Sequence, residues 1–310
     1  MHIDLWIALA GLIVGVVVGL TGMGGGALMT PILVIGFGIA PLAAVSSDLV
    51  AAVVMKPIGG TIHFRRGTVH TGLVKWLALG SVPGALLGSY VISHLGDGVG
   101  NDIKVILGVV LLIAATAMVV RAFIAARHRG SVEGDEAARV PVRIVPTFIV
   151  GLFGGFIVGM TSVGSGSLMI VALMLLYPML SGKELVGTDL VQAVPLVLAA
   201  AIGHLIWGEF ELAITASLLL GSIPGVIIGS SVSSRAPDAV IRPILVLVLT
   251  LSAMKLLEVP DAALATVMGI ALGAGAIIAF VVMRRRSAAA LVPAPLAPSG
   301  DPAAPPSAPD

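Results

Sequence analysis

The two halves of this sequence repeat each other, which limits the chain to an architecture of two related units. Residues of the first half return 140 positions later, and these pairs are Gly11 and Gly151, Gly15 and Gly155, Gly19 and Gly159, Thr21 and Thr161, Gly24 and Gly164, and Gly26 and Gly166. Farther along the spacing becomes 141, and the pairs are Asp48 and Asp189, His63 and His204, Gly67 and Gly208, and Pro83 and Pro224. The matches are collinear and include the rarer Asp, His and Pro, so we interpret them as a duplication.

Long apolar runs fill almost the whole chain before residue 284. Of the 310 residues, 58% are hydrophobic and 11% are charged, whereas soluble domains carry about 25% charged residues. Several runs reach the roughly 20 residues that a helix needs to cross a bilayer core. The first run, from Leu5 to Leu20, follows His2 and Asp4 rather than a basic segment, so we predict a retained helix and not a secretory signal. The pattern predicts a polytopic membrane protein.

Apolar runs and the breaks between them predict an all-α integral membrane fold with five segments in each half. The first-half segments are 5–22, 25–37, 41–64, 71–95 and 102–122. The second-half segments are 143–162, 165–180, 183–206, 211–233 and 239–257, and an extra helix follows at 262–283. The predicted domains are a first membrane repeat (1–123), a cytoplasmic linker (124–142), a second, inverted membrane repeat (143–258), an extra transmembrane helix (259–286) and a disordered cytoplasmic tail (287–310).

Basic residues predict how the chain lies in the membrane. The triplet 284–286, the linker residue Arg129, and Arg65 mark cytoplasmic ends under the positive-inside rule. An alternating path then starts outside, makes five passages to the basic linker and five more to Glu258, and returns once to the cytoplasm. Because five is odd, the second unit enters the membrane from the opposite side. We therefore predict an inverted repeat in the plasma membrane, with the N-terminus outside and the C-terminus in the cytoplasm.

Each half is interrupted by a glycine-rich stretch, from Thr21 to Gly26 and from Thr161 to Gly166. A broken helix at membrane depth is tolerated only where protein buries it or where it lines an aqueous cavity. Half-helices that start near Gly25 and Ser165 offer free N–H groups and a positive dipole end, which suit an anion. Inverted repeats bring two such ends together, as in the substrate sites of secondary transporters. A pair of tight turns without a ligand is the alternative interpretation.

The residues around these breaks resemble a known family. The stretch T-G-M-G-G-G-A-L-M-T-P at Thr21, its echo T-S-V-G-S-G-S-L-M at Thr161, and the G-S-x-P-G-x-x-x-G blocks at Gly80 and Gly221 are similar to the sulfite exporter TauE/SafE family of membrane transporters. The likeness covers residues 5–283. It implies an inverted-repeat fold and transport of small sulfur-containing anions, with sulfite, sulfonates and thiosulfate among the proposed cargoes.

We predict that the cargo binds between the two breaks. Ser162 and Ser165 stand where the first half has Gly22 and Gly25, so the second break has more hydroxyl donors for a tetrahedral oxyanion. Lys56 has no basic counterpart in the second half, because the repeat alignment pairs it with a valine. Its side chain could attract an anion, pair with a carboxylate or extend to the membrane interface. The predicted substrate-binding residues are Thr21, Gly22, Gly24, Gly25, Gly26, Lys56, Thr161, Ser162, Gly164, Ser165, Gly166 and Gln192.

Asp48 and Asp189 lie in the third segment of each half, and carboxylates inside a membrane usually mark a functional pathway. Two roles stay open, namely coupling through a proton relay, or structural support of a broken helix, including an N-cap for their own helix. His63 and His204 fall near segment ends, where we expect interfacial anchoring rather than proton handling.

A secondary transporter accounts for the inverted repeat, the breaks and the sparse polar groups, and no ATP-binding P-loop sequence occurs. An anion channel is the nearer alternative, and an intramembrane serine hydrolase with Ser165 as nucleophile and His204 as base is the more distant one. We expect no enzymatic activity, no cofactor and no metal. The expected partners are a small anion, the lipid bilayer and a possible second copy of the chain, and the net charge of +1 favours no nucleic acid.

Overall fold

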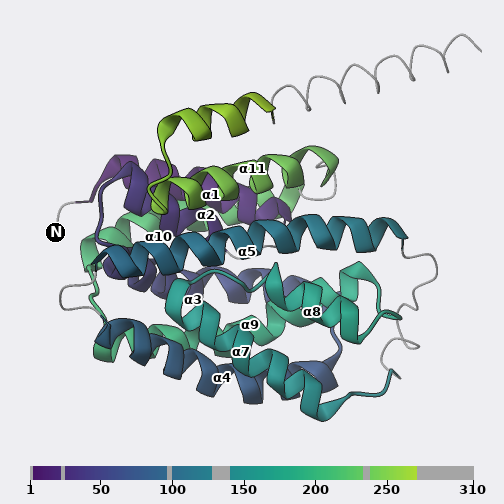
Figure 1. The fold of residues 1–310 in the computed structure, drawn as a ribbon. Helices are drawn as coiled ribbons and strands as arrows, with labels where there is room; N and C mark the ends of the chain where they lie inside the picture. The colour runs from purple at the N-terminus through teal and green to yellow at the C-terminus, as the bar shows by residue number, and fades with distance from the viewer. Residues whose placement is uncertain (1–2, 22–24, 96–99, 128–139, 233–237, 271–310) are drawn as a thin grey trace, which may run out of the picture. The chain divides into compact units, whose positions relative to one another are not determined.

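The computed structural model describes residues 3–21, 25–95, 100–127, 140–232 and 238–270, and its regular elements there are all helices (Figure 1). The chain divides into two units, Met1–Leu264 and Ala265–Asp310. The described part of the second unit, residues 265–270, is helical and belongs to the helix Asp261–Ile270. The predicted all-α class is confirmed, while most of the predicted extra helix and the predicted tail lie outside the described residues.

Most helices follow the predicted segments, but α8 (Leu168–Leu176) is shorter than the predicted segment 165–180 and α5 (Gly100–Arg127) extends beyond the predicted segment 102–122. Those of the first half are α1 (Leu5–Thr21), α2 (Gly26–Pro31), the π-helix η1 (Ile32–Gly36), α3 (Pro41–Arg65), α4 (Thr71–His94) and α5 (Gly100–Arg127). Those of the second half are α7 (Ile144–Thr161), α8 (Leu168–Leu176), α9 (Gly182–Trp207), α10 (Leu212–Val232) and α11 (Asp238–Leu256). Six of them, α3, α4, α5, α7, α9 and α10, are long and apolar enough to cross a membrane. The fold is that of a multi-pass membrane protein.

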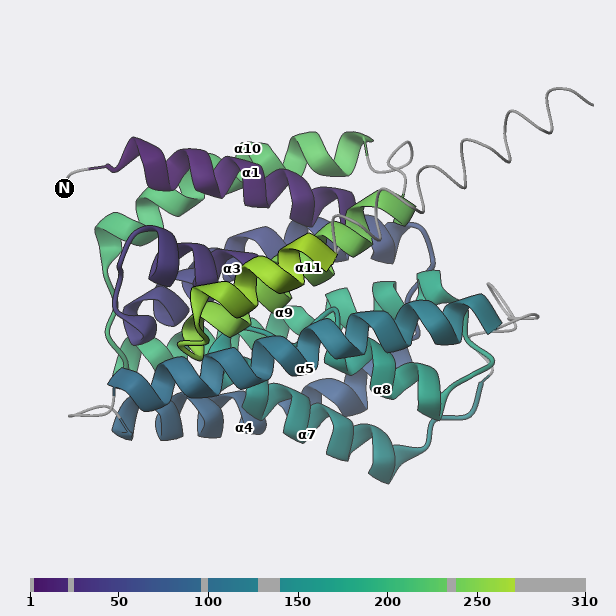
Figure 2. The same cartoon turned by 45° about the horizontal axis from the view of Figure 1, so that its top comes forward.

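Helices of the two halves pack in reciprocal pairs. α1 lies along α10 and α4 lies along α7, as Figures 1 and 2 both show. The contacts repeat in register, because Gly15 packs on the backbone of Ser222 while its repeat mate Gly155 packs on the backbone of Ser81, the mate of Ser222. α3 packs on α9, and α5 packs on α11. This exchange is what two related units produce around a shared axis, and the inversion of the repeat across a bilayer stays a prediction.

Close backbone approach explains why glycines line these paired helices. A methyl group placed on Gly221 would lie 1.7 Å from the carbonyl oxygen of Ala8 in α1. We expect Gly221→Ala to lower the free energy of unfolding by about 1–3 kcal/mol, the usual cost of overpacking. The measurement is thermal unfolding in detergent. Gly182→Ala is the control, since a methyl group there meets no atom within 4 Å, and equal melting temperatures for the two variants would contradict this packing.

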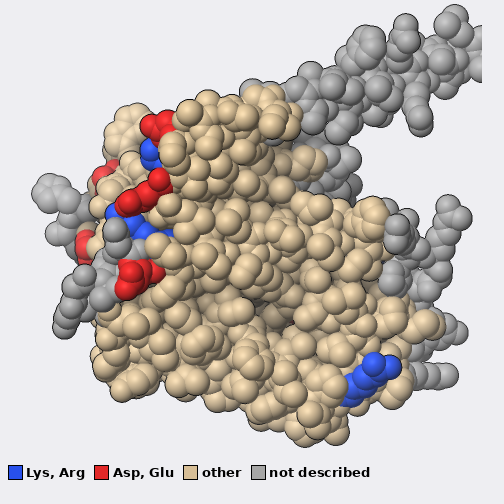
Figure 3. Space-filling model, viewed as in Figure 1, with Lys and Arg blue, Asp and Glu red and all other residues tan. Residues whose placement is uncertain are grey.

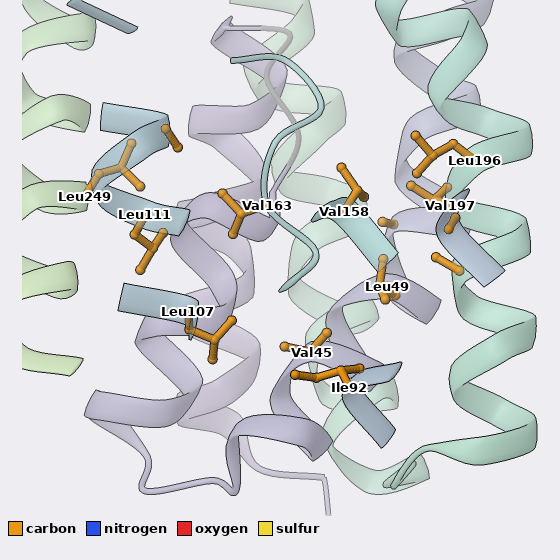
Figure 4. Packing of buried hydrophobic residues seen from close by; sticks show 14 of the residues in the cluster. Val45, Leu49, Ile92, Leu107, Leu111, Val158, Val163, Leu196, Val197 and Leu249 are labelled. Carbon is orange, nitrogen blue, oxygen red and sulfur yellow. The ribbon is translucent and has the colours of Figure 1, made fainter. Parts of the chain in front are cut away.

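A hydrophobic core surrounds the second glycine break. Figure 4 shows Val163, on the irregular segment after α7, between Leu111 of α5 and Val158 of α7. Its side chain is 1% exposed. Leu49 of α3 belongs to the same cluster. Apolar packing thus buries the irregular backbone inside protein, as the membrane environment requires of a broken helix.

The outer surface separates apolar and charged regions. On the face seen in Figure 3, acidic and basic side chains gather at the left end and basic side chains lie at the lower right, and a broad band without charged side chains lies between. Large apolar side chains such as Trp6, Phe153 and Leu175 are exposed. Such a surface would be costly in water, whereas lipid is a suitable solvent for it. The band therefore fits the hydrocarbon region of a membrane.

Candidate functional site

The second break begins where α7 ends. Ser162 adopts a left-handed backbone with φ of 59°, and Gly164 and Gly166 have φ of 127° and 91°. Glycine takes such angles readily, so the sequence favours a sharp change of direction here. The Thr161 hydroxyl also accepts from the Val163 N–H at 3.1 Å. Helical structure resumes at Leu168, three residues later than the predicted start near Ser165, because the positive φ values interrupt the helix.

The first break is described only in part, since Gly22 and Gly24 lie outside the described residues. Gly25 precedes α2, which starts at Gly26. Gly26 touches the second break, and a methyl group on it would lie 1.9 Å from the carbonyl oxygen of Ser162. The structure therefore brings the two glycine breaks into contact, which the sequence argument expected of paired half-helices.

Lys56 reaches the second break from α3. It is 7% exposed, and its Nζ donates a hydrogen bond to the hydroxyl of Ser165, itself 8% exposed. Asp48 and Asp189 both lie close enough to interact electrostatically with the ammonium group. Of the three sequence-based options for Lys56, extension to the membrane interface is wrong, because the side chain turns inward toward Ser165.

Asp48 joins the two halves of the protein. The Ser162 hydroxyl donates to its Oδ2 at 2.6 Å, and the Thr30 hydroxyl of α2 donates to the same oxygen at 3.4 Å. The carboxylate is 1% exposed. α3 begins at Pro41, so Asp48 lies within the helix, and the N-cap interpretation is wrong. Its hydrogen bonds instead connect Thr30, which follows the first break, to Ser162 in the second break, where the two breaks meet at a junction.

Asp189 supports the second break from α9. It accepts hydrogen bonds from Gln192 Nε2 at 3.0 Å and from the backbone N–H of Gly166. Because α9 begins at Gly182, the N-cap interpretation is wrong for this residue too. Gln192 is tied further into the core, since its Oε1 accepts from the Ser81 hydroxyl of α4 at 3.2 Å. Gln192 is therefore a support for Asp189 in this structure.

Arg121 is a site residue that sequence reasoning missed. Its Nη1 donates to the carbonyl oxygen of Gly166 at 3.2 Å, and its charge also acts on Asp189. The predicted segment ended at 122, which made Arg121 look like a terminal residue, whereas α5 continues to Arg127. Thr30 and Ser81 were missed as well, because small hydroxyl residues are ordinary components of membrane helices.

The hydroxyls of the two threonines in the breaks donate hydrogen bonds to backbone carbonyls of their own helices. Thr21 Oγ1 donates to the Val17 carbonyl at 2.7 Å, and Thr161 Oγ1 donates to the Ile157 carbonyl at 2.7 Å. In this conformation neither proton points to a ligand between the breaks. Their predicted part in cargo binding stays a prediction.

His204 is a buried structural residue. It is fully buried, and its ring nitrogens bond to the Ser46 hydroxyl at 2.8 Å and to the Gly159 carbonyl at 2.7 Å. Interfacial anchoring is therefore wrong for His204. Both ring nitrogens are engaged away from Ser165, so the Ser165–His204 pairing of the hydrolase alternative is not formed in this structure. His63, near the end of α3, bonds to the Thr68 hydroxyl at 2.9 Å. Among the residues described, no three His, Asp or Glu side chains gather as a metal site would require.

The helical fold, the apolar band and the buried charges at a helix break define a multi-pass membrane protein of the transporter class. Residues 7–256 match the family described as Sulfite exporter TauE/SafE, and the chain belongs to this family. The probable membrane transporter protein YjnA of Bacillus subtilis (strain 168) is 40% identical over 255 residues, which cover 81% of this chain and 98% of YjnA. The resemblance noted in the sequence is thereby confirmed.

Two further relatives from Bacillus subtilis (strain 168) are more distant. The probable membrane transporter protein YdhB is 24% identical over 79% of this chain and 96% of its own length. The probable membrane transporter protein YunE is 26% identical over 80% of this chain and 94% of its own length. No solved structure matches the chain. The family and these relatives are named as transporters, and they support a membrane transporter here.

Proposed function

We propose that this protein is a secondary transporter of a small sulfur-containing oxyanion, such as sulfite, thiosulfate or a sulfonate. The observation that carries the proposal is the buried ammonium group of Lys56 at the contact between the two breaks. Its bond to the neutral Ser165 hydroxyl leaves two further N–H donors on the ammonium group for other acceptors. An oxyanion is a stronger partner for an ammonium group than a hydroxyl is, because a charge-assisted hydrogen bond is about twice as strong as a neutral one.

In this proposal the cargo lies beside Ser165, with Lys56 as its main charged contact. The sulfur–oxygen groups replace the Ser165 hydroxyl at the ammonium group, and the freed hydroxyl donates to the anion. Asp189 keeps the backbone N–H of Gly166 in place and Arg121 holds the Gly166 carbonyl. The break thus retains its shape while the contact of Lys56 changes.

The proposal includes an inverted repeat and alternating access. The reciprocal packing of α1 on α10 and of α4 on α7 supports two equivalent units that rock around the central contact. Arg65 and Arg66 lie at the turn between α3 and α4, and their positive charges support a cytoplasmic location for this turn. We place the protein in the plasma membrane with its N-terminus outside and its C-terminus in the cytoplasm.

Counterflow exchange tests this function. Proteoliposomes loaded with unlabelled thiosulfate are expected to accumulate labelled thiosulfate transiently, because a carrier returns loaded in each direction. An anion channel shows no counterflow, so uptake without it would favour the channel. Binding of sulfite, thiosulfate, sulfate and methanesulfonate to the purified protein ranks the cargoes. Absence of binding by every one of these anions would end the proposal.

A further inference from the structure

The two buried carboxylates differ in the groups that bond to them. Asp189 accepts from the Gln192 amide and from the Gly166 backbone N–H. Asp48 accepts from the hydroxyls of Ser162 and Thr30. An N–H group only donates, so the N–H partners of Asp189 suit an ionised carboxylate. A hydroxyl donates or accepts, so the partners of Asp48 serve a carboxylate or a carboxylic acid equally well.

The charges around the breaks sum to zero before a cargo arrives. Lys56 and Arg121 are the cations, and Asp48 and Asp189 are the anions. An incoming anion would leave an uncompensated negative charge in a buried site, which costs several kcal/mol per ion. Binding of one proton restores the balance for a monovalent anion. Of the two carboxylates, Asp48 is the one whose hydrogen bonds survive protonation.

The other ionisable groups near Asp48 have partners of their own. α2, η1 and α10, which pack against α3, contain no Asp, Glu, Lys, Arg or His. α5 contributes Arg121, which bonds to the Gly166 carbonyl. On α9, Asp189 bonds to Gln192 and Gly166, and His204 bonds to Ser46 and Gly159. Lys183 and Glu184 belong to the first turn of α9, and Glu184 bonds to Ser181. On α3 itself the charged group beside Asp48 is Lys56.

We propose that Asp48 carries a proton together with the anion, so that the transporter is an anion–proton symporter. This inference rests on the proposed function and adds its coupling ion. The proton enters from the same aqueous side as the anion and forms an O–H bond at Asp48 Oδ2. That O–H then donates to Ser162 Oγ, and the Ser162 hydroxyl turns its own proton to the anion. On the other side both ligands leave and the original hydrogen bond returns.

Proton and anion favour each other in this scheme. A neutral Asp48 no longer competes with the cargo for the charge of Lys56, and Ser162 gains a free donor. Thermodynamic linkage makes the effect reciprocal, so the anion strengthens proton binding by the same factor. The Ser162 to Asp48 contact, which joins the second half to the first, changes direction at the same time.

Proton uptake on anion binding is the direct test. Methanesulfonate is the probe, because it is monovalent and keeps a fixed charge around neutral pH. Adding methanesulfonate to purified protein in weakly buffered detergent solution is expected to remove about one proton per bound anion from the medium. In proteoliposomes clamped at zero membrane potential, an acidic exterior is expected to drive accumulation of methanesulfonate by about ten-fold per pH unit.

Asp48→Asn separates the coupling from the transport. Asn cannot ionise, and its amide N–H can donate to Ser162 Oγ as the protonated acid does, so we expect counterflow to persist while proton uptake and accumulation driven by pH are lost. Asp189→Asn is the matched comparison, and whatever anion binding it retains is expected to keep its proton uptake.

Several results would overturn the symport. These are counterflow without proton uptake in the unmodified protein, accumulation that follows a sodium gradient instead, or proton uptake that survives in Asp48→Asn. The unmodified protein alone decides the question if Asp48→Asn does not fold. Absence of both anion binding and counterflow in the unmodified protein would instead refute the transport function itself.

Discussion

Replacing Lys56 by Gln is expected to lower the affinity for thiosulfate by about 10-fold to 100-fold, since hydrogen bonds to charged groups contribute about 1.5–3 kcal/mol. Lys56 is the cation at the contact of the breaks, with its Nζ on the Ser165 hydroxyl. Glutamine keeps a polar end but no charge. Counterflow of thiosulfate should fall with the affinity. The measurements are isothermal titration with purified protein and counterflow in proteoliposomes.

Two comparisons make this result specific. Lys56→Arg keeps the positive charge and is expected to retain more binding than Lys56→Gln, although the larger guanidinium fits the buried space less well. Lys75→Gln removes an exposed lysine of α4 and is expected to bind thiosulfate like the unmodified protein. The Gln variant also leaves Asp48 and Asp189 without their shared cation, so its melting temperature is measured alongside. Unchanged affinity in a folded Lys56→Gln protein would remove Lys56 from the cargo site.

The helices could be predicted because a bilayer imposes a length on apolar segments. The predicted segments 41–64 and 183–206 agree with α3 and α9 to within a residue or so. The breaks were harder to place. Glycine content showed that the chain turns after Thr161, but the conformations of Ser162 and Gly166, which delay α8 to Leu168, depend on packing that apolar periodicity does not report.

The members of the site could be predicted better than its contacts. Lys56 and Asp48 stood out because charged residues inside apolar runs are costly and rare. Their partners are far away in sequence, since Ser165 lies 109 positions from Lys56 and Ser162 lies 114 positions from Asp48. Such pairs follow from how the two halves pack, and a single sequence carries no signal for them.

The alignment of the two repeats was most informative at polar residues that have no equivalent in the other half. Gln192 and Lys56 lack equivalents in the opposite half, and both contribute to the asymmetric chemistry around Asp189 and Ser165. The duplicated aspartates, in contrast, looked equivalent and have different partners. Hydroxyls surround Asp48, whereas N–H groups surround Asp189. A shared scaffold therefore does not fix the protonation behaviour of the residues that it places in equivalent positions.

Gly26→Ala is expected to destabilise the protein by about 3 kcal/mol, at the upper end for overpacking, and to abolish counterflow. Its new methyl group would lie 1.9 Å from the carbonyl oxygen and 2.6 Å from the hydroxyl oxygen of Ser162. Both atoms belong to the junction of the two breaks, and the hydroxyl is the one that bonds to Asp48. The backbone at the junction must move apart to admit the methyl group, because the nearest atom is a backbone carbonyl oxygen and not the end of a flexible side chain.

The neighbouring glycine provides the matched control for stability. A methyl group on Gly25 would first meet the flexible end of Met55, at 3.5 Å, and the backbone at Gly25 has the φ of −61° that alanine adopts without strain. Gly25→Ala is therefore expected to melt near the temperature of the unmodified protein, while Gly26→Ala melts clearly lower. Equal melting temperatures would mean that the two breaks are not in contact, and the central site would then have to be sought elsewhere. If Gly26→Ala stays folded and still exchanges thiosulfate at the normal rate, the junction does not control transport.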